Sequence, residues 1–326
     1  MQRQLMALLH KRIEVGVAIV ALVLVIGFTA STRGVWLSSA NLSEVLRVTA
    51  VLAIMAFGVA LVITVGEIDI SVGSTFGIVG ITYLAFAVQV GVPLAILIAL
   101  LVAAAIGAIN GFIVAYFKIP SLIVTLGTLF FFRGLAYAVL AGTTAFKADD
   151  AMRANPFYKL FGGSGIFGYN NALLWALVVL LILNYVLFLT PLGNRLLAAG
   201  GNAPSALSRG VRIFNIKLGA FIACAVLAGL AGILEASNLG FVDGSFGRQR
   251  ELQAIAAAVL GGCALAGGRT SLIGTFLGAF ILSGIQSYLV INHIQPQWFI
   301  LLLGLIVVLV SLADRGLTLM FTRLAR

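Results

Sequence analysis

The strongest constraint in this sequence is a series of long apolar runs that are almost free of Asp, Glu, Lys and Arg. A helix needs roughly 20 apolar residues to cross the hydrocarbon core of a bilayer, and these runs reach or approach that length. Only 9% of the residues are charged, which is not the composition of a soluble domain. We therefore predict an all-α fold, a polytopic helical bundle in a membrane. The predicted spans, about ten, cover residues 15–32, 48–66, two helices within 70–117, 121–141, 171–190, 218–237, 252–268 and two helices within 270–313.

Two of these runs leave an alternative open. The first follows a basic start and could be a cleaved signal peptide, but no convincing A-x-A site follows it, which favours a retained span. Residues 252–268 are short and rich in Gly and Ala, so they are expected either to cross the membrane or to fold back as a re-entrant segment. Residues 1–326 are expected to form a single transmembrane permease domain.

The positions of the basic residues predict which loops face the cytoplasm, because Lys and Arg are concentrated in short cytoplasmic loops. With the N-terminus inside, 12 of the 20 basic residues face the cytoplasm, six face outside, and Arg47 and Arg133 lie within spans. Both termini are therefore predicted to be cytoplasmic. The loop at 191–217 is then cytoplasmic, and the longest outer loop is 142–170.

An internal similarity suggests that part of the chain is duplicated. Residues 53–77 align without gaps with residues 254–278, and several glycines coincide. Transporters often contain repeats, but glycine-rich membrane helices also match by chance, so both explanations stay open. Pairs of small residues four positions apart are expected to permit close helix packing, at Gly73/Gly77, Gly107/Gly111, Gly274/Gly278 and Ala225/Gly229. The glycine-rich segments 66–74 and 261–268 could alternatively break the helices at a substrate site.

The chain contains no sequence pattern for nucleotide binding or catalysis. None of its five lysines follows a glycine, so the Walker A motif is absent. A nominal G-x-G-x-x-G at Gly163, Gly165 and Gly168 has no strand before it and is interpreted as a flexible turn. Cys224 and Cys263 lie within apolar runs and indicate neither a disulfide framework nor a metal site. The spans contain no paired acids and no nucleophile constellation, which argues against an intramembrane enzyme with catalytic residues of its own.

Ionisable residues inside a membrane are costly, at roughly 2.5–3.5 kcal/mol each on insertion scales, and therefore point to function. Arg133 lies well inside the fifth predicted span, and Glu235 is the one acid predicted within a span. We expect Arg133 and Glu235 to form an ion pair near the outer side. The alternative is that Arg133 extends its long side chain to the outer interface.

The fifth span also carries residues that suit a sugar. Thr125, Thr128 and Phe132 recur at helical spacing and share a face, and a sugar offers apolar C–H faces and many hydroxyl groups. The alternative is that the threonines bond the carbonyls four residues earlier and Phe132 packs against a neighbouring helix. Asn110 and Gln286 are expected to be buried amides of similar standing. The predicted substrate-pathway residues are therefore Asn110, Thr125, Thr128, Phe132, Arg133, Glu235 and Gln286.

The loop at 191–217 is much longer than a simple connection between two helices requires. Asn202 can cap a short helix, Pro204 suits its first turn, and Gly210 can end it just after Arg209. Ala203, Ala206 and Leu207 give this helix a small apolar face. Such a helix with a basic rim is expected to dock into a groove of a partner protein. Binding to lipid headgroups is the alternative.

Four blocks of the sequence resemble a known family. They are GEIDISVGS (66–74), KIPSLIVTLGTLFFFRG (118–134), AAGGNAPSALSRGV (198–211) and ELQAIAAAVLGGCALAGGRTSLIGT (251–275). In this order they resemble the ribose-type, monosaccharide permeases of bacterial ABC importers, within the branched-chain-permease-like superfamily. The resemblance covers residues 41–316. It departs from the family at Glu67, which replaces the second glycine of Gly-Gly-Ile-Asp, and at GRQREL, which replaces GxGYEL; both bear on substrate identity rather than on fold.

The resemblance implies a type II importer permease, a multi-pass protein of the bacterial inner membrane that does no chemistry itself. Its implied partners are a cytoplasmic ABC ATPase, an extracytoplasmic sugar-binding protein, membrane lipids and a second permease copy or a paralogue. No cofactor is expected in this chain, since ATP and Mg would bind to the ATPase, and no nucleic-acid partner is expected. The loop at 200–211 would be the coupling helix, with coupling residues Gly200, Gly201, Asn202, Pro204, Ala206, Leu207, Arg209 and Gly210.

The implied substrate is a monosaccharide, either a pentose, a deoxyhexose or a hexose. A sugar-like autoinducer is the alternative within the same family. A secondary transporter driven by an ion gradient is a further alternative, which would need titratable groups in the middle of the membrane. Because Glu235 is the only acid expected there, the sequence argues against ion coupling.

Overall fold

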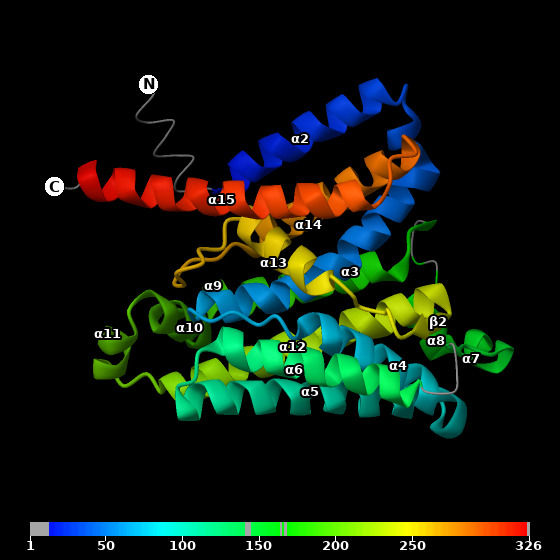
Figure 1. Ribbon diagram of the computed structural model, residues 1–326, viewed down its shortest axis with the longest axis horizontal. Coiled ribbons are helices and arrows are strands. Elements are labelled where there is room, and N and C mark those ends of the chain that lie inside the picture. Colours follow the sequence, from blue (N-terminus) through cyan, green and yellow to red (C-terminus); the bar gives the residue numbers. More distant parts are fainter. Residues whose placement is uncertain (1–12, 141–144, 164, 166–167, 325–326) are drawn as a thin grey trace.

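The computed structural model describes residues 13–140, 145–163, 165 and 168–324, and most of these residues lie in helices (Figure 1). Two three-residue strands, β1 (Ala145–Lys147) and β2 (Phe241–Asp243), are the exceptions to an all-helical fold. The helices are α2 (Ile13–Ser31), the 3-10 helix η1 (Val35–Leu37), α3 (Ser39–Thr64), α4 (Val72–Val90), α5 (Val92–Phe117), α6 (Ser121–Val139), α7 (Asp150–Ala154), α8 (Pro156–Gly162), α9 (Asn171–Leu189), α10 (Pro191–Gly201), α11 (Ala203–Ser208), α12 (Ile213–Leu239), α13 (Arg250–Leu260), α14 (Leu272–Ile291) and α15 (Gln297–Leu324).

Eight of the described helices are long and apolar enough to cross a membrane, namely α2, α3, α4, α5, α6, α9, α12 and α14. α15 adds a further apolar stretch over Gln297–Val310. The predicted polytopic helical bundle is confirmed. Each predicted apolar run corresponds to one long helix, except for residues 252–268.

Residues 252–268 do not form a spanning helix. α13 has 11 residues and is therefore about 16 Å long, roughly half the thickness of a hydrocarbon core. Arg250, at the start of α13, pairs with Glu235 near the end of α12, whereas Gly267 contacts Gly66 beyond the end of α3. Residues 252–268 therefore extend from one end of the bundle to the other, as expected if they cross the membrane rather than fold back. Only the first half of the segment is helical.

α3 is the central helix of the bundle and is buried along most of its length. α12 packs against α3, α4 and α5, and α14 packs against α3 and α2. In Figure 1, α2, α14 and α15 lie on one side of α3, and α5 and α6 lie on the other. This arrangement leaves α2, α6 and α9 with mostly exposed apolar surfaces, as expected for helices that face lipid.

Glycines allow the backbones of the central helices to approach closely. A Cβ atom on Gly58 of α3 would lie 2.9 Å from the Cα atom of Cys224 on α12, and one on Gly107 of α5 would lie 2.6 Å from the carbonyl oxygen of Phe221. Because lipid removes the hydrophobic drive between helices, such close backbone packing supplies much of the association energy. The predicted packing role is confirmed at Gly107, whereas Gly58 was not among the predicted small-residue pairs.

The two glycine-rich segments also interrupt their helices. Gly66 follows α3 with φ 78°, and Gly267 follows α13 with φ 84°, a left-handed region that favours glycine. The next helices, α4 and α14, begin after the serines Ser71 and Ser271, which are one residue out of register in the alignment. Residues 53–77 and 254–278 therefore share a helix–break–helix structure, which supports a duplication.

The bundle has two distinct ends (Figure 1). α11, the start of α2 and the end of α15 lie at one end, which we call the α11 end. α7, α8 and the small sheet lie at the opposite end, which we call the α8 end. In the sheet, β1 pairs antiparallel with β2, with Phe146 opposite Val242, and this pairing ties the long loop after α6 to the end of α12.

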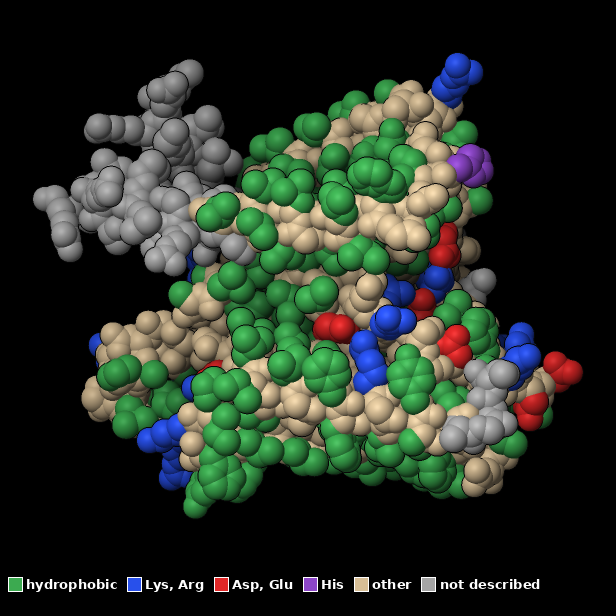
Figure 2. Space-filling model, in the orientation of Figure 1, with side chains coloured by type: hydrophobic (Ala, Val, Ile, Leu, Met, Phe, Trp, Pro, Cys, Tyr) green, Lys and Arg blue, Asp and Glu red, His purple; other side chains and the backbone are tan. Residues whose placement is uncertain are grey.

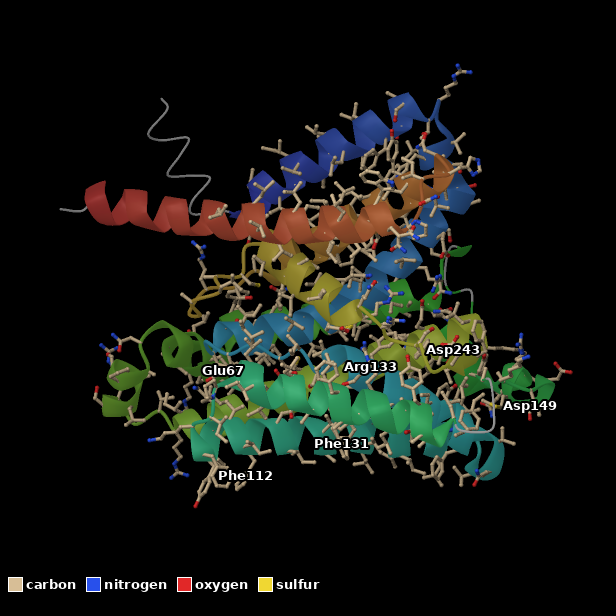
Figure 3. All side chains as sticks on the ribbon, viewed as in Figure 1. Glu67, Phe112, Phe131, Arg133, Asp149 and Asp243 are labelled. Atoms are coloured by element: carbon tan, nitrogen blue, oxygen red, sulfur yellow. The ribbon has the colours of Figure 1, made fainter. Side chains whose placement is uncertain are left out.

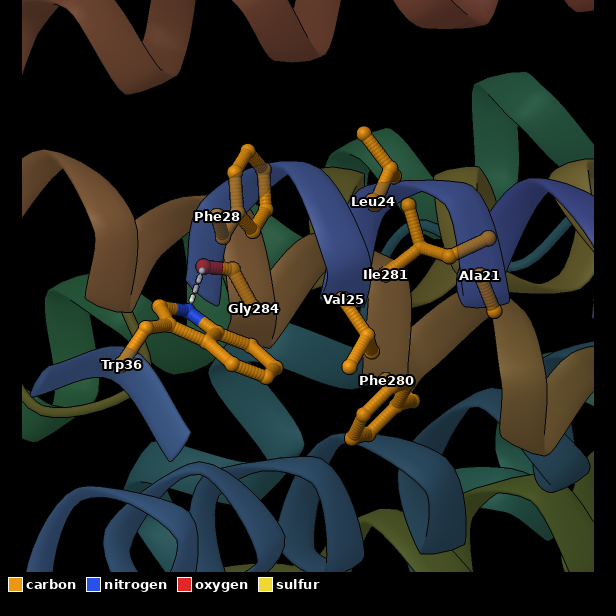
Figure 4. Close-up of a pocket in the computed structure, with 8 residues that line it drawn as sticks. All are labelled: Ala21, Leu24, Val25, Phe28, Trp36, Phe280, Ile281 and Gly284. Carbon is orange, nitrogen blue, oxygen red and sulfur yellow. Dashed lines mark hydrogen bonds between the residues drawn. The ribbon is translucent and has the colours of Figure 1, made fainter. Parts of the chain in front are cut away.

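η1 attaches α2 to α14. The indole Nε1 of Trp36 donates a hydrogen bond of 3.2 Å to the carbonyl oxygen of Gly284 (Figure 4), and Trp36 is 1% exposed. The cavity beside this contact has a volume of about 10 Å³ and an apolar lining. A cavity so small and apolar is a packing gap rather than a ligand site.

Candidate functional site

The predicted short helix in the loop at 191–217 is present as α11. The side chain of Asn202 accepts a hydrogen bond of 3.0 Å from the backbone N–H of Ser205, and Pro204 lies in the first turn. Arg209 is the C-cap residue, and Gly210 follows with φ 80°. The predicted boundaries and caps of this helix are confirmed, because each depends on residues close together in sequence.

The apolar residues of α11 do not form one exposed face. Ala206 is 3% exposed and packs toward the bundle, whereas Leu207 is 62% exposed. Ala203 is half-buried. A partner that contacts α11 therefore meets Leu207, and Ala206 positions the helix.

A groove of about 870 Å³ opens beside α11, between it, the α5–α6 connection and the start of α12. Three basic side chains, Lys118, Arg212 and Lys217, lie along it, with Glu67 as the one acid. The remaining lining is largely apolar and includes Leu207. The surface beside α11 therefore combines apolar contact area with positive charge.

A network of ion pairs lies between α6, α13, α12 and α3. Arg133 of α6 pairs with Glu251 of α13, at 3.3 Å from the guanidinium nitrogen to the carboxylate oxygen. Glu235 of α12 pairs with Arg47 at 2.5 Å and with Arg250 at 3.4 Å. The expected ion pair between Arg133 and Glu235 is therefore wrong: the two residues lie in separate groups of ion pairs, which come together only at the consecutive residues Arg250 and Glu251 of α13.

The network borders a hollow in the molecular surface. Figure 2 shows basic and acidic side chains gathered between the layer that carries α15 and the layer that carries α6. Figure 3 places Arg133 between these layers, while Phe131, two residues earlier, lies on the outer side of α6. Arg133 is six residues, or about 9 Å, before the end of α6. Charged groups at this depth require protein or water, rather than lipid, in front of them.

The threonine hydroxyl groups of α6 donate hydrogen bonds to backbone carbonyl oxygens of the same helix. Thr125 donates to the carbonyl oxygen of Ser121 at 2.8 Å, and Thr128 donates to that of Val124 at 3.2 Å. Phe132 is half-buried and packs against the core. The hydrogen bonds and packing of these three residues are therefore those of the alternative explanation. Thr125 is also fully buried, so of the two threonines only Thr128 has an exposed part that a sugar could reach.

Asn110 belongs to a buried polar cluster at the break between α3 and α4. Its side-chain amide donates 2.8 Å to the hydroxyl of Ser71, which donates 2.6 Å to a carboxylate oxygen of Asp69. Burial raises the pKa of Asp69, which lies between the two spanning helices, to about 6, against the opposing effect of the Ser71 hydrogen bonds. Its other carboxylate oxygen has no hydrogen-bond partner among the described residues.

Gln286 does not match its prediction. Its side chain is exposed on α14, not buried as expected. Because α14 carries apolar residues all around its axis, the sequence pattern does not reveal which side faces the core. Gln286 and Asn110 therefore do not belong to one site.

Sequence reasoning missed three charged residues that the structure brings into contact. Glu251 pairs with Arg133 and Arg47 pairs with Glu235, although Glu251 lies just before the predicted segment 252–268 and no partner was predicted for Arg47. Glu67 pairs with Lys217, 150 positions away. The one available signal was the departure of Glu67 from the family pattern, which left a carboxylate where a glycine is usual.

The described residues contain no group of three or more His, Cys, Asp and Glu side chains that could hold a metal ion. Cys224 and Cys263 are both free and buried. The Cys263 sulfur lies 3.1 Å from the hydroxyl oxygen of Thr270. Two regions with charged and polar side chains, the surface around α11 and the charged hollow, are therefore considered below for a partner and a solute.

Comparison with known proteins identifies the family. A family model described as the permease component of the branched-chain amino acid transport system matches residues 41–311. The autoinducer 2 import system permease protein LsrC of Yersinia pseudotuberculosis serotype O:1b is 36% identical over 268 residues, which cover 81% of this chain and 74% of the relative. The LsrC proteins of Yersinia pestis strain Pestoides F and Yersinia enterocolitica serotype O:8 are also 36% identical, over 81% of this chain and 74% and 72% of their own lengths.

No solved structure matches the chain. The family match and the helical bundle agree with each other, since a permease component lies in a membrane and eight of the described helices are long and apolar enough to cross one. All four sequence blocks lie within the matched residues 41–311. The chain belongs to the family of permease components of branched-chain-type transport systems, the superfamily of ABC importer permeases that those blocks predicted.

Proposed function

We propose that this chain is the membrane-spanning subunit of a binding-protein-dependent ABC importer that carries a monosaccharide or a sugar-like autoinducer into the cytoplasm. The observation that carries the proposal is α11, a capped helix with an exposed Leu207 beside a groove of about 870 Å³ with basic side chains. Because the chain has no Walker A motif, the proposal places ATP hydrolysis on a partner subunit. The curated relatives named above are autoinducer 2 import permeases, which supports a small sugar-like substrate.

In this proposal the α11 end faces the cytoplasm. The excess of basic residues in the loops assigned to that side supports the orientation. The groove beside α11 adds Lys118, Arg212 and Lys217 to the surface available to an ATPase. The α8 end would then face the binding protein.

The substrate would pass along the hollow that the ion-pair network borders. Charged side chains such as the half-buried Arg133 and the buried Glu251 can exchange hydrogen bonds with sugar hydroxyls, and their mutual pairing limits the cost of burial. The open side of the hollow requires a cover other than lipid, which a second permease copy or a paralogue would provide. ATP-driven closure of the ATPase would press on α11 and shift the bundle between outward-facing and inward-facing states.

The proposal is tested by uptake into proteoliposomes that contain the permease with its ATPase and binding protein. Labelled ribose, rhamnose and autoinducer 2 are supplied together with the binding protein, and the substrate is chosen as the compound that raises the melting temperature of that protein. We expect uptake only with ATP on the ATPase side and no loss of uptake on addition of a protonophore. Uptake that is independent of ATP and abolished by the protonophore would identify an ion-coupled transporter instead.

A further inference from the structure

The helix that precedes α11 ends in backbone contact with the end of α3. A Cβ atom on Gly200 would overlap the carbonyl oxygen of Thr64 and lie 2.8 Å from the backbone nitrogen of Gly268. That nitrogen donates a hydrogen bond of 2.9 Å to the same Thr64 oxygen. The last turn of α10 is therefore held against the final residue of α3 without an intervening side chain.

The helix that follows α11 is attached to the same place. Lys217, near the start of α12, forms an ion pair with Glu67, three residues beyond the end of α3. Their side chains are 23% and 14% exposed, so solvent screens the pair only in part. Figure 3 shows Glu67 near the α11 end of the bundle. Both flanks of α11 thus contact residues 64–67.

The chain continues from this attachment to the start of α6. The backbone N–H of Ile68 donates 3.1 Å to the hydroxyl of Ser121, the first residue of α6. Thr125, one turn later, makes a longer contact of 3.4 Å with the carbonyl oxygen of Ile68. α6 also carries Arg133, on the border of the charged hollow. Residues 64–68 therefore join the two flanks of α11 to the helix that lines the proposed pathway.

We propose that residues 64–68 form a transmission segment, which passes the movement of α11 to α6, and that the Glu67–Lys217 ion pair is the positioning contact that fixes α12 to it. This inference rests on the proposed function, because α11 moves only if an ATPase drives it. A six-residue helix attached through flexible flanks would move without effect on the bundle. Attachment of both flanks to one segment converts its displacement into a displacement of α6.

The test measures substrate imported per ATP hydrolysed by the reconstituted complex of permease, ATPase and binding protein. Glu67→Gln and Lys217→Met each remove one charge of the pair while keeping a side chain of similar length. We expect each to lower import per ATP about five-fold or more, within the range of measured coupling energies. Because Glu67 and Lys217 also lie on the groove beside α11, the amount of ATPase that co-purifies with each variant is measured in parallel, and import per ATP is compared at equal amounts of bound ATPase.

Three further variants separate positioning from a general effect on stability. The charge exchange Glu67→Lys with Lys217→Glu should return import per ATP to within about two-fold of wild type, because it restores the attraction. Lys217→Arg should also retain coupling. Glu14→Gln is the matched control, since Glu14 is another partly buried carboxylate but accepts its hydrogen bond from Ser271; it should leave import per ATP unchanged.

The proposal is overturned if the single variants keep import per ATP within about two-fold of wild type, or if the charge exchange leaves their loss in place. A separate variant, Leu207→Asp, reports on the proposed function in the same assay. If Leu207→Asp releases the ATPase while Glu67→Gln remains coupled, only the transmission segment is wrong. If Leu207→Asp retains both ATPase and transport, the proposed role of α11 itself is wrong.

Discussion

Charged residues inside the bundle are paired with residues from other helices. Glu235 is 5% exposed and accepts from two arginines, Arg47 and Arg250. Arg133 forms its ion pair with Glu251 instead. Pairing of this kind removes most of the cost of placing ions in a membrane protein, but it leaves each charge dependent on its partner.

Asp69 is the exception at the residue scale, because it is fully buried and accepts hydrogen bonds without a basic partner in the described contacts. Its folded pKa of about 6 lies above the ordinary value of 3.8. The folded protein therefore binds more protons than the unfolded chain between these values, and its stability falls as pH rises through this window. The difference corresponds to a destabilisation on the order of 3 kcal/mol at neutral pH.

Asp69→Asn should remove this pH dependence, because Asn stays neutral and can still accept the Ser71 hydrogen bonds. We expect the variant to melt at a higher temperature than wild type at pH 7.5, and the advantage to shrink as pH is lowered to 4.5. Thermal unfolding in detergent across this range measures the difference. A melting-temperature difference that does not vary with pH would contradict the assignment of a raised pKa.

The sequence predicted local features of single residues much better than distant pairs. The caps of α11 were predictable because Asn202 and Ser205 are three positions apart. The partner of Arg133 lies 118 positions away, and its identity depends on the rotation and depth of α13 relative to α6. A change of one residue along a helix turns a side chain by about 100°, so the apolar pattern alone could not choose between Glu235 and Glu251.

At the scale of helices, the bundle is organised around contacts that only small residues permit. Gly107 allows α5 to lie against the backbone of α12, whereas Gly127 of α6 has open space where its Cβ would be. The sequence could mark both as small residues within apolar runs. It could not separate them, because that distinction depends on which face meets a neighbouring helix.

Gly107→Ala and Gly127→Ala provide a matched pair of substitutions. Both replace a helical glycine and gain about 1 kcal/mol of helix propensity. We expect Gly127→Ala to keep or raise the melting temperature, and Gly107→Ala to lower it, because its Cβ would lie 2.6 Å from the carbonyl oxygen of Phe221. Equal changes in melting temperature for the two variants would contradict the close α5–α12 packing.

At the scale of the whole molecule, nine of the ten predicted apolar runs are long helices, because length and hydropathy are enough to define a span. The tenth became a half-helix because Gly261, Gly262, Gly267 and Gly268 favour irregular backbone at its second half. That irregular half reaches the α11 end and contacts Gly200 and Gly66. The broken segments therefore meet beside the element proposed to receive the ATPase.

The central claim is that the ATPase attaches at α11, and site-specific photocrosslinking tests it most directly. A photoreactive phenylalanine analogue is placed at Leu207, which is 62% exposed at the α11 end, and in a separate variant at Leu160, which is 42% exposed on α8. In membranes that contain the full complex, we predict a covalent adduct with the ATPase from position 207 and none from position 160. No ATPase adduct from position 207, or an ATPase adduct from position 160, would contradict the account.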